Sequence, residues 1–386
     1  MLNYCTQFLE YSILRLILTP KIGVKTAFNL LQNLTNANIN DLFSKPKNIL
    51  PNIRKDQEQQ LLIYPKDIDK YYIKHQLWLE QDNHHFINIF SPYYPKSLLD
   101  LYDPPIALYV QGDIKNLNNL SISIVGSRQA TPNGLQTAYD FAKDLANHSI
   151  NIISGLAEGI DTAAHKGALM HGTTTAVVGT GLDIVYPRKN LDLAYKIIKQ
   201  GCIISEFLLA TPPSTNNFPR RNRIIAALCK GILVVEASLQ SGSLITARLA
   251  NEIGRDIFAI PSSINSPNSK GCHLLIKQGA NLIDNIDDIL QFWWINTSLT
   301  TVNKFNNQIN NNSINIQNDD DLTTKNTNLT QIQNKIIQNM GYDPIHLDIL
   351  ASRSQIDINV LQAEIFLLEM DNMISHISGG IYQIKK

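Results

Sequence analysis

The sequence predicts an α/β fold, doubly wound, with a mostly parallel sheet, and two observations within residues 86–295 carry that prediction. The first is a series of short segments rich in Ile and Val, at 121–125, 150–153, 174–178, 202–205, 231–235 and 256–260. Strands that are apolar on both faces belong inside a parallel sheet covered by helices on both sides. The second is the helical spacing of apolar residues between these segments, clearest at 134–147 and 243–254. We therefore expect a Rossmann-like sheet in this domain.

The first 85 residues predict a small helical domain, because their apolar residues recur at helical spacing. This domain is expected to be of the SAM-like or helix-hairpin-helix (HhH-like) type. The segment around Lys21 and Gly23 is similar to the turn of a helix-hairpin-helix, whose backbone N–H groups can hold a DNA phosphate. Lys21 stands where such turns usually have glycine, so a packing role is favoured over phosphate binding.

The C-terminal part predicts a linker followed by a winged helix. Residues 296–330 contain eleven asparagines and no apolar period, which is typical of a flexible linker. Residues 331–386 then predict a winged-helix domain with helices near 331–340, 346–351 and 357–370 and a hairpin of 373–377 with 381–384. Between 346 and 384 there are five acidic residues and one base, Arg353. DNA would repel such a module, so a protein-contact or regulatory role, including masking of a basic site, is favoured over duplex reading.

Composition limits where a polyanion could bind. The chain has 386 residues, and its 33 Lys and Arg residues balance 33 Asp and Glu residues. Any affinity for phosphate must therefore be local. The cysteines (Cys5, Cys202, Cys229 and Cys272) form no CxxC pair, which predicts reduced thiols and no metal site. No apolar run is long enough to span a membrane and no signal-peptide pattern is present, so a cytoplasmic location is expected.

The loops that follow the predicted strands are rich in glycine and serine. In an open α/β sheet, ligands bind beyond the carboxyl ends of the strands, where helix N-termini offer free N–H groups to phosphate. A tight strand-to-helix turn explains any one of these loops, but five on one edge favour a ligand site. The candidate contacts are Gly126, Ser127, Ser154, Gly155, Gly159, Gly179, Gly181, Ser241, Gly242 and Ser243.

Arginines on the same edge strengthen this interpretation. Arg220, Arg221 and Arg223 fall in the first turns of a predicted helix, where the macrodipole disfavours each cation by roughly 0.3–1 kcal/mol. They make sense there if they face an anion, and Arg128 lies on the same edge. Phe218 could stack on a base, a contact worth about 1–3 kcal/mol, or could be a core residue. With Asn222, which lies between two of the arginines, these residues predict a site for single-stranded DNA.

Catalytic signatures are missing from the sequence. It contains no GxxxxGK[ST] loop, no GxGxxG after the first predicted strand and no HExxH. We therefore expect no catalytic residue, no cofactor and no metal. Four acids line the crevice (Asp161, Asp183, Glu206 and Glu236), and helix capping or pairing with arginine is favoured for them over acid–base chemistry. A nucleotide-hydrolysing enzyme and a winged-helix regulator of duplex DNA remain as alternatives.

Several stretches occur in an order that points to a known family. They read GSR at 126–128, SGLAEGID at 154–161, GTGLDIVYPRKN at 179–190, FPRRNRIIA at 218–226 and SGSLITARLANEIGR at 241–255. Over about residues 90–290 the chain resembles the DprA/Smf (DNA processing protein A) family. The resemblance implies a homodimeric protein of natural transformation that protects incoming single-stranded DNA and loads the RecA recombinase. It also implies that Arg128, Phe218, Arg221 and Arg223 contact the DNA.

The chain departs from the family pattern in three places. Residues 207–213 are longer and more apolar than the usual SE-x-P-x-G segment, and 214–217 lack the basic residue that some relatives carry. Ser262 replaces the usual glycine after Pro261. Arg220 is expected to compensate for the missing base. These departures bear on the path of the DNA and leave the predicted class unchanged.

Overall fold

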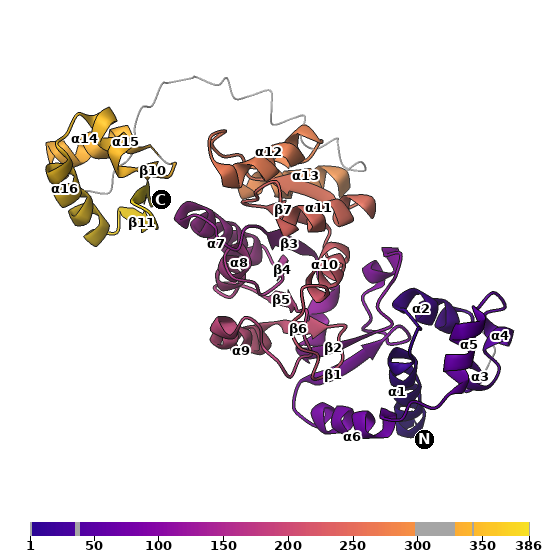
Figure 1. The fold of residues 1–386 in the computed structure, drawn as a ribbon. Helices are drawn as coiled ribbons and strands as arrows, with labels where there is room; N and C mark the ends of the chain where they lie inside the picture. The colour runs from indigo at the N-terminus through magenta and orange to yellow at the C-terminus, as the bar shows by residue number, and fades with distance from the viewer. Residues whose placement is uncertain (1, 35–38, 298–328, 342, 386) are drawn as a thin grey trace.

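The computed structural model describes residues 2–34, 39–297, 329–341 and 343–385, arranged as a helical N-terminal part, a central α/β part and a small C-terminal part (Figure 1). Among these residues, no helix is both long and apolar enough to span a bilayer.

The central part is built on a sheet of nine strands among the described residues, in the order β1-β2-β6-β5-β4-β3-β7-β8-β9. The strands from β6 to β9 in that order pair in parallel, while β2 pairs antiparallel with both β1 and β6. The fold class predicted from the sequence is confirmed. The strands are β1 (His84–Asn88), β2 (Ala107–Gly112), β3 (Ser121–Val125), β4 (Asn151–Ser154), β5 (Thr174–Val177), β6 (Cys202–Ser205), β7 (Gly231–Val234), β8 (Asp256–Ala259) and β9 (Asn281–Leu282).

Helices cover both faces of this sheet. Ile122 and Ile124 of β3 point into one apolar layer with the helices α7 and α8, whereas Val125 points into the other layer with α10 and α11. Parallel strands need this double cover because neither of their faces is polar. The helices are α7 (Pro132–Asn147), α8 (Ile160–Ala168), α9 (Leu191–Gln200), α10 (Asn217–Leu228), α11 (Gly242–Glu252), α12 (Lys270–Lys277) and α13 (Ile286–Thr297), with short 3-10 turns at η1 (Lys96–Asp100), η2 (Ile114–Asn118), η3 (Arg188–Asn190) and η4 (Pro267–Ser269).

The order of the strands fixes where a ligand can bind. The chain runs from β3 outward through β4, β5 and β6, and then returns to place β7 on the other side of β3. The carboxyl ends of β3 and β7 therefore flank the switch point of the sheet, where ligands bind in folds of this kind.

The N-terminal part packs α1 (Leu2–Leu18), α2 (Val24–Gln32), α3 (Asp41–Ser44), α4 (Pro46–Ile49) and α5 (Lys55–Leu62) around a buried core that includes Ile13, Leu30 and Leu61. The helix α6 (Ile68–Leu79) packs through Trp78 into another cluster, which includes Tyr109 of β2. Lys21 adopts a left-handed backbone, with φ of 64°, as a glycine would. Its ammonium group lies 3.6 Å from the carboxylate of Asp56. The lysine side chain is exposed, and its carbonyl oxygen accepts from Gln57 Nε2 of α5 at 3.0 Å.

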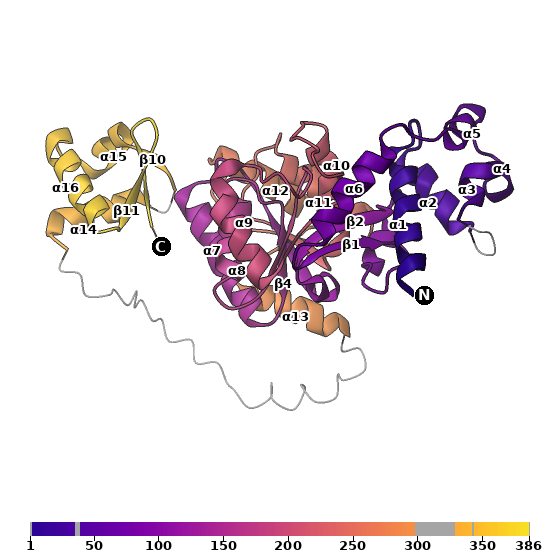
Figure 2. The same cartoon turned by 90° about the horizontal axis from the view of Figure 1, so that it is seen from below.

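The C-terminal part is a winged helix, as predicted. It consists of α14 (Gln331–Met340), β10 (Ile345–His346), α15 (Leu347–Ser354), α16 (Ile358–Met370), β11 (Ile374–Ile377) and β12 (Ile381–Ile384). Figure 2 shows its strands on the side of the central part and α16 on the outer side. The predicted linker, 296–330, lies almost wholly outside the described residues. The predicted domain limits at 85, 295 and 331 stay predictions.

One histidine is enclosed in the central core. His165 on α8 is fully buried, and its Nδ1 lies 2.7 Å from the hydroxyl of Thr174. That hydroxyl donates to the carbonyl oxygen of Ile152 at 2.6 Å. The imidazole must therefore donate from Nδ1, which leaves Nε2 unprotonated. Burial, aided by the charge of Arg221, lowers the pKa of His165 to about 3.

We predict that His165 stays neutral down to at least pH 5. Below about pH 6.5 the unfolded chain gains a proton at this residue that the fold does not accept, so the free energy of unfolding falls, by at most about 1.4 kcal/mol per pH unit. Histidine-selective NMR on the wild type, with His165→Gln to assign the signal, checks this. A signal that titrates near pH 6.5 contradicts the prediction.

Candidate nucleic-acid interface

Three loops bring a cation and two aromatic rings together at the carboxyl edge of the sheet. The guanidinium carbon of Arg128, after β3, lies 5.4 Å from the ring centroid of Phe218 at the start of α10. The Phe218 ring stacks on Tyr186, from the loop after β5, with centroids 5.8 Å apart and planes at 30°. Arg128 and Tyr186 are exposed and Phe218 is half-buried. We call these three residues the Arg128 cluster.

The backbone beneath the cluster is held rigidly. The Ser127 N–H donates to the Glu236 carbonyl oxygen at 2.7 Å, which fixes the loop that carries Arg128 against β7. A Cβ at Gly179 would lie 3.1 Å from the Phe218 ring, so glycine lets the ring settle on the loop after β5. The exposed arginine side chain therefore extends from a loop whose backbone is hydrogen-bonded to the segment after β7.

Sequence reasoning missed Tyr186. It belongs to the 179–190 stretch, of which only the glycines were predicted to contact a ligand. A tyrosine followed by a proline does not by itself indicate a stacked ring. Two exposed cations, Arg188 and Lys189, follow it directly, and the Lys189 ammonium lies 3.2 Å from Glu158. Basic residues next to an exposed ring are the signal that could have found this position.

Arg221 does not face solvent. Only 4% of the residue is exposed, and its Nη1 donates to the carbonyl oxygens of Gly155 and Val177. Burial lowers its pKa to about 10, against the attraction of Asp161. A side chain enclosed in this way contacts protein and cannot reach a phosphate, contrary to the expectation from the sequence.

Arg223 is buried as well, with 6% of the residue exposed. It forms an ion pair with Glu206, and its Nη1 donates to the backbone carbonyl of Asp103 at 2.8 Å. Arg220, which is half-exposed, lies 3.4 Å from the other oxygen of Glu206. The anion that these two arginines face near the helix start is thus a carboxylate of the protein, and of the two only Arg220 is exposed enough to meet a phosphate.

The glycine turns serve the packing of the protein at most positions. A Cβ at Gly155 would lie 1.9 Å from the Arg221 guanidinium, and one at Gly159, where φ is 79°, would lie 2.2 Å from the Ser127 carbonyl oxygen. Gly126 and Gly181 are also in close contact with protein atoms, and Ser154 is buried with its hydroxyl donating to Ile124. Close approach to protein therefore accounts for these residues without a ligand.

The turn at 241–243 and Asn222 complete the predicted set. The Ser241 hydroxyl caps α11 by accepting from the N–H of Ser243 at 3.3 Å, while a Cβ at Gly242 would meet nothing within 4 Å. Asn222 is half-buried on α10 between the two enclosed arginines. Of this group, Gly242 has open space in front of it.

The four acids of the crevice are engaged in the fold. Asp161 accepts from the Gly155 N–H at 3.0 Å, and Asp183 accepts from the Ala210 N–H at 2.7 Å. Glu236 accepts from the backbone and hydroxyl of Thr131, which caps α7, and burial raises its pKa. Glu206, which is bound to two arginines, has the pairing role that the sequence favoured. Asp183 instead pairs with Lys74 at 2.8 Å, and Asp161 holds loop amides.

The apolar departure at 207–213 has a structural explanation. Phe207 and Leu209 are buried, and Leu209 packs in a cluster with Trp78 of α6. The Leu209 N–H donates to the Tyr71 hydroxyl at 2.7 Å. This segment therefore joins the N-terminal part to the sheet.

Within the described residues, no group of three or more His, Cys, Asp or Glu side chains is placed to hold a metal ion. The thiols of Cys202, Cys229 and Cys272 are free and buried, and burial raises the pKa of each.

Comparison with known proteins decides the family. The family model for DNA recombination-mediator protein A matches residues 85–294, and that for the DprA winged helix domain matches residues 321–380. The chain belongs to this DprA/Smf family. It is 46% identical over 237 residues to Protein Smf of Escherichia coli, which covers 61% of this chain and 63% of that protein. It is 44% identical over 204 residues to DNA processing protein DprA of Streptococcus pneumoniae, which covers 53% of this chain and 72% of that protein. The match thus spans less than two thirds of the Escherichia coli relative.

Two solved structures of the family are also similar. The DprA structure from Streptococcus pneumoniae shares 37% identity, with a TM-score of 0.56, and the match covers 70% of this chain and 98% of that one. The structure from Helicobacter pylori shares 32% identity, with a TM-score of 0.50, and covers 55% of this chain and 97% of that one. The latter is described as showing the single-stranded DNA binding mode of that protein.

We predict that Arg221 is required for stability and its neighbour Arg220 is not. Arg221→Met leaves two buried carbonyls and Asp161 without their cation, which should cost about 3–5 kcal/mol. Arg220→Met removes a half-exposed arginine from the buried Glu206, which keeps its ion pair with Arg223, and should therefore cost clearly less. Thermal unfolding of both variants beside the wild type tests this. Equal melting temperatures for the two variants would refute the structural role of Arg221.

Proposed function

We propose that this protein binds single-stranded DNA along the carboxyl edge of the sheet, with the Arg128 cluster as the main contact. The observation that carries the proposal is the position of Arg128 itself. It is exposed, and in the described part of the chain it stacks over an aromatic ring and takes part in no ion pair. A guanidinium beside two stacked rings offers a phosphate contact and base-stacking surfaces in one place.

The family supports this proposal. The Helicobacter pylori relative is described as a single-stranded DNA binder, and the Streptococcus pneumoniae relative is named a DNA processing protein. We infer the same substrate here, together with protection of incoming DNA during transformation and loading of RecA onto it. The site is a binding site without chemistry, since the acids of the crevice are occupied by backbone amides and arginines. Arg220, Arg188 and Gly242 extend the contact surface, and Arg221 and Arg223 support it from below.

We predict that Arg128→Ala weakens binding of a fluorescent oligothymidylate about ten- to hundredfold, because a charge-assisted contact is worth roughly 1.5–3 kcal/mol. Anisotropy titrations at several salt concentrations measure this. The slope of log K against log salt is expected to become shallower by about 0.7 in the variant, the amount for one phosphate contact.

The matched control is Lys199→Ala, which removes an exposed cation at the opposite edge of the sheet, just before β6. It should leave affinity and salt slope unchanged. If Arg128→Ala binds the oligothymidylate with wild-type affinity, the assignment of the site is wrong. Hydrolysis of nucleotides that is abolished by Glu236→Gln would establish the enzyme alternative, and preference for one duplex sequence that depends on the winged helix would establish the regulator.

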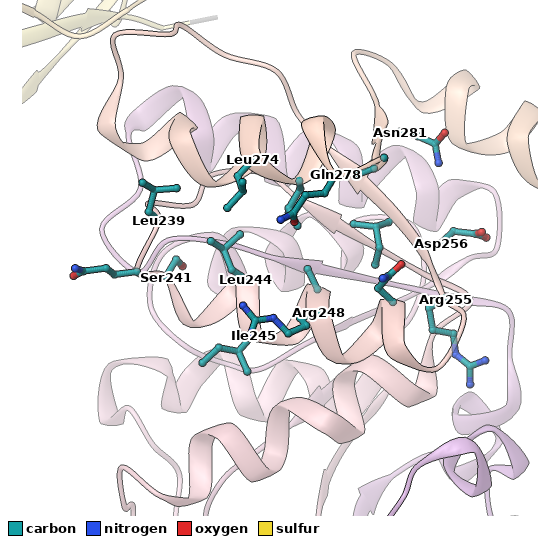
Figure 3. Close-up of a pocket in the computed structure, with 17 residues that line it drawn as sticks. Leu239, Ser241, Leu244, Ile245, Arg248, Arg255, Asp256, Leu274, Gln278 and Asn281 are labelled. Carbon is teal, nitrogen blue, oxygen red and sulfur yellow. The ribbon is translucent and has the colours of Figure 1, made fainter.

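We also propose that two copies associate through the groove between α11 and α12, which is lined by both apolar and polar side chains. Figure 3 shows this groove. The groove has a volume of about 580 Å³. Ile245 is 44% exposed and Leu274 38% exposed at this groove, with Leu239 and Leu282 exposed nearby. Clustered exposed apolar side chains mark interaction surfaces, and homodimers are common in this family.

We predict that Ile245→Glu with Leu274→Glu shifts the protein to monomers, because association would bury two carboxylates in place of two apolar side chains. Light scattering behind size exclusion, over a concentration series, measures the dissociation constant, which should rise at least about tenfold. Leu62→Glu, at a position on α5 that is 50% exposed, is the control. If the wild type is monomeric at every concentration, the proposed dimer is excluded. The proposed DNA-binding site is unaffected by that result.

A further inference from the structure

The helix α16 of the winged helix is apolar on two opposite faces. Its inner face carries Leu361, Ile365 and Leu368, which are at most 1% exposed and form the core of the unit. At 3.6 residues per turn, a second set of apolar residues aligns on the opposite side of the helix. This set is Val360, Phe366, Leu367 and Met370, which are 43%, 61%, 48% and 68% exposed. We call these four residues the outer stripe.

Acidic residues border the outer stripe. Helical spacing puts Glu364 along one edge and Glu369, next to Gln362, along the other. Asp357 caps the start of the helix and Asp371 follows its end. One oxygen of Glu364, Oε2, is shielded from solvent and has no hydrogen-bond partner among the described residues. A shielded carboxylate oxygen without a donor is a site that a cationic group would satisfy.

The outer stripe faces away from the central part of the chain. Figures 1 and 2 both place α16 on the far side of the winged helix from the central part. The opposite side, with Pro344 and Gln383, lines a cavity of about 350 Å³ with Thr131 and Glu236 of the central part. Contact with the central part therefore does not cover the outer stripe.

Charge selects the occupant of this surface. From Asp357 to Asp371, which includes all of α16, the chain has four carboxylates and no Lys or Arg, so a nucleic acid would be repelled from this surface. A second copy of the same helix would bring acidic edges against acidic edges, which opposes association. We propose that the outer stripe binds an amphipathic helix of another protein, one with a leucine-like apolar stripe and Lys or Arg along both edges. An apolar face laid along an apolar stripe, with opposite charges at its rims, is a recurrent mode of helix recognition.

The test uses the full chain and two synthetic helical peptides labelled with fluorescein. Both peptides repeat leucine at i, i+3, i+4 and i+7; one has lysine and the other glutamate at the flanking positions. We expect saturable binding of the lysine peptide, at least about tenfold weaker binding of the glutamate peptide, and loss of binding as salt rises. The triple variant Phe366→Ser, Leu367→Ser and Met370→Ser should lose at least about tenfold in affinity.

A charge-reversed variant, Glu364→Lys with Glu369→Lys, is the matched control and should prefer the glutamate peptide. Arg128→Ala should bind the lysine peptide as the wild type does, which separates this proposal from the DNA site. The proposal is overturned if neither peptide binds, if both bind equally, or if the triple variant binds like the wild type. It is also overturned if the triple variant abolishes self-association of the wild type, because a second copy would then occupy the stripe.

Discussion

The buried guanidinium of Arg221 is the interaction on which the edge of the sheet depends. Its donation to the carbonyls of Gly155 and Val177 ties the ends of β4 and β5 to α10. The same helix begins with Phe218, which meets Arg128 from the loop after β3. A cation in the core therefore holds in place the loops that present a second cation to solvent, and burial makes this arrangement costly to break.

Glu206 ties the end of the next strand, β6, to α10 in a similar way. It follows β6 and receives both Arg220 and Arg223, so the first turns of α10 are neutralised by a carboxylate of the protein. This explains how a helix start tolerates several arginines, where the macrodipole alone would disfavour them. The net charge of zero therefore hides a local arrangement in which Arg221 and Arg223 are enclosed by protein groups, whereas Arg128 and Arg220 are exposed.

The sequence predicted the parallel strands well, because β3 to β8 are short and apolar. It did not predict β1 and β2, since a mixed segment such as His84–Asn88 lacks the uniform apolar pattern of a buried strand. At the candidate site it grouped Arg128 with Phe218 correctly, but it could not separate Arg220 from Arg221. Phosphate, carboxylate and carbonyl groups all attract a guanidinium, and only burial tells which of them is present. Tyr186 was missed because stacking is a property of two loops that meet in space.

The make-up of the Arg128 cluster has a consequence for what the protein can distinguish. The two ring faces can stack on unpaired bases, and the guanidinium can bind a phosphate. Every nucleotide has both groups, so these contacts carry little sequence information. Reading base order would need side chains held in hydrogen-bonding position at base edges, whereas the guanidinium of the cluster lies over the Phe218 ring. For the proposed contact with single-stranded DNA, this predicts an affinity that depends on the charge and length of the strand more than on its base order.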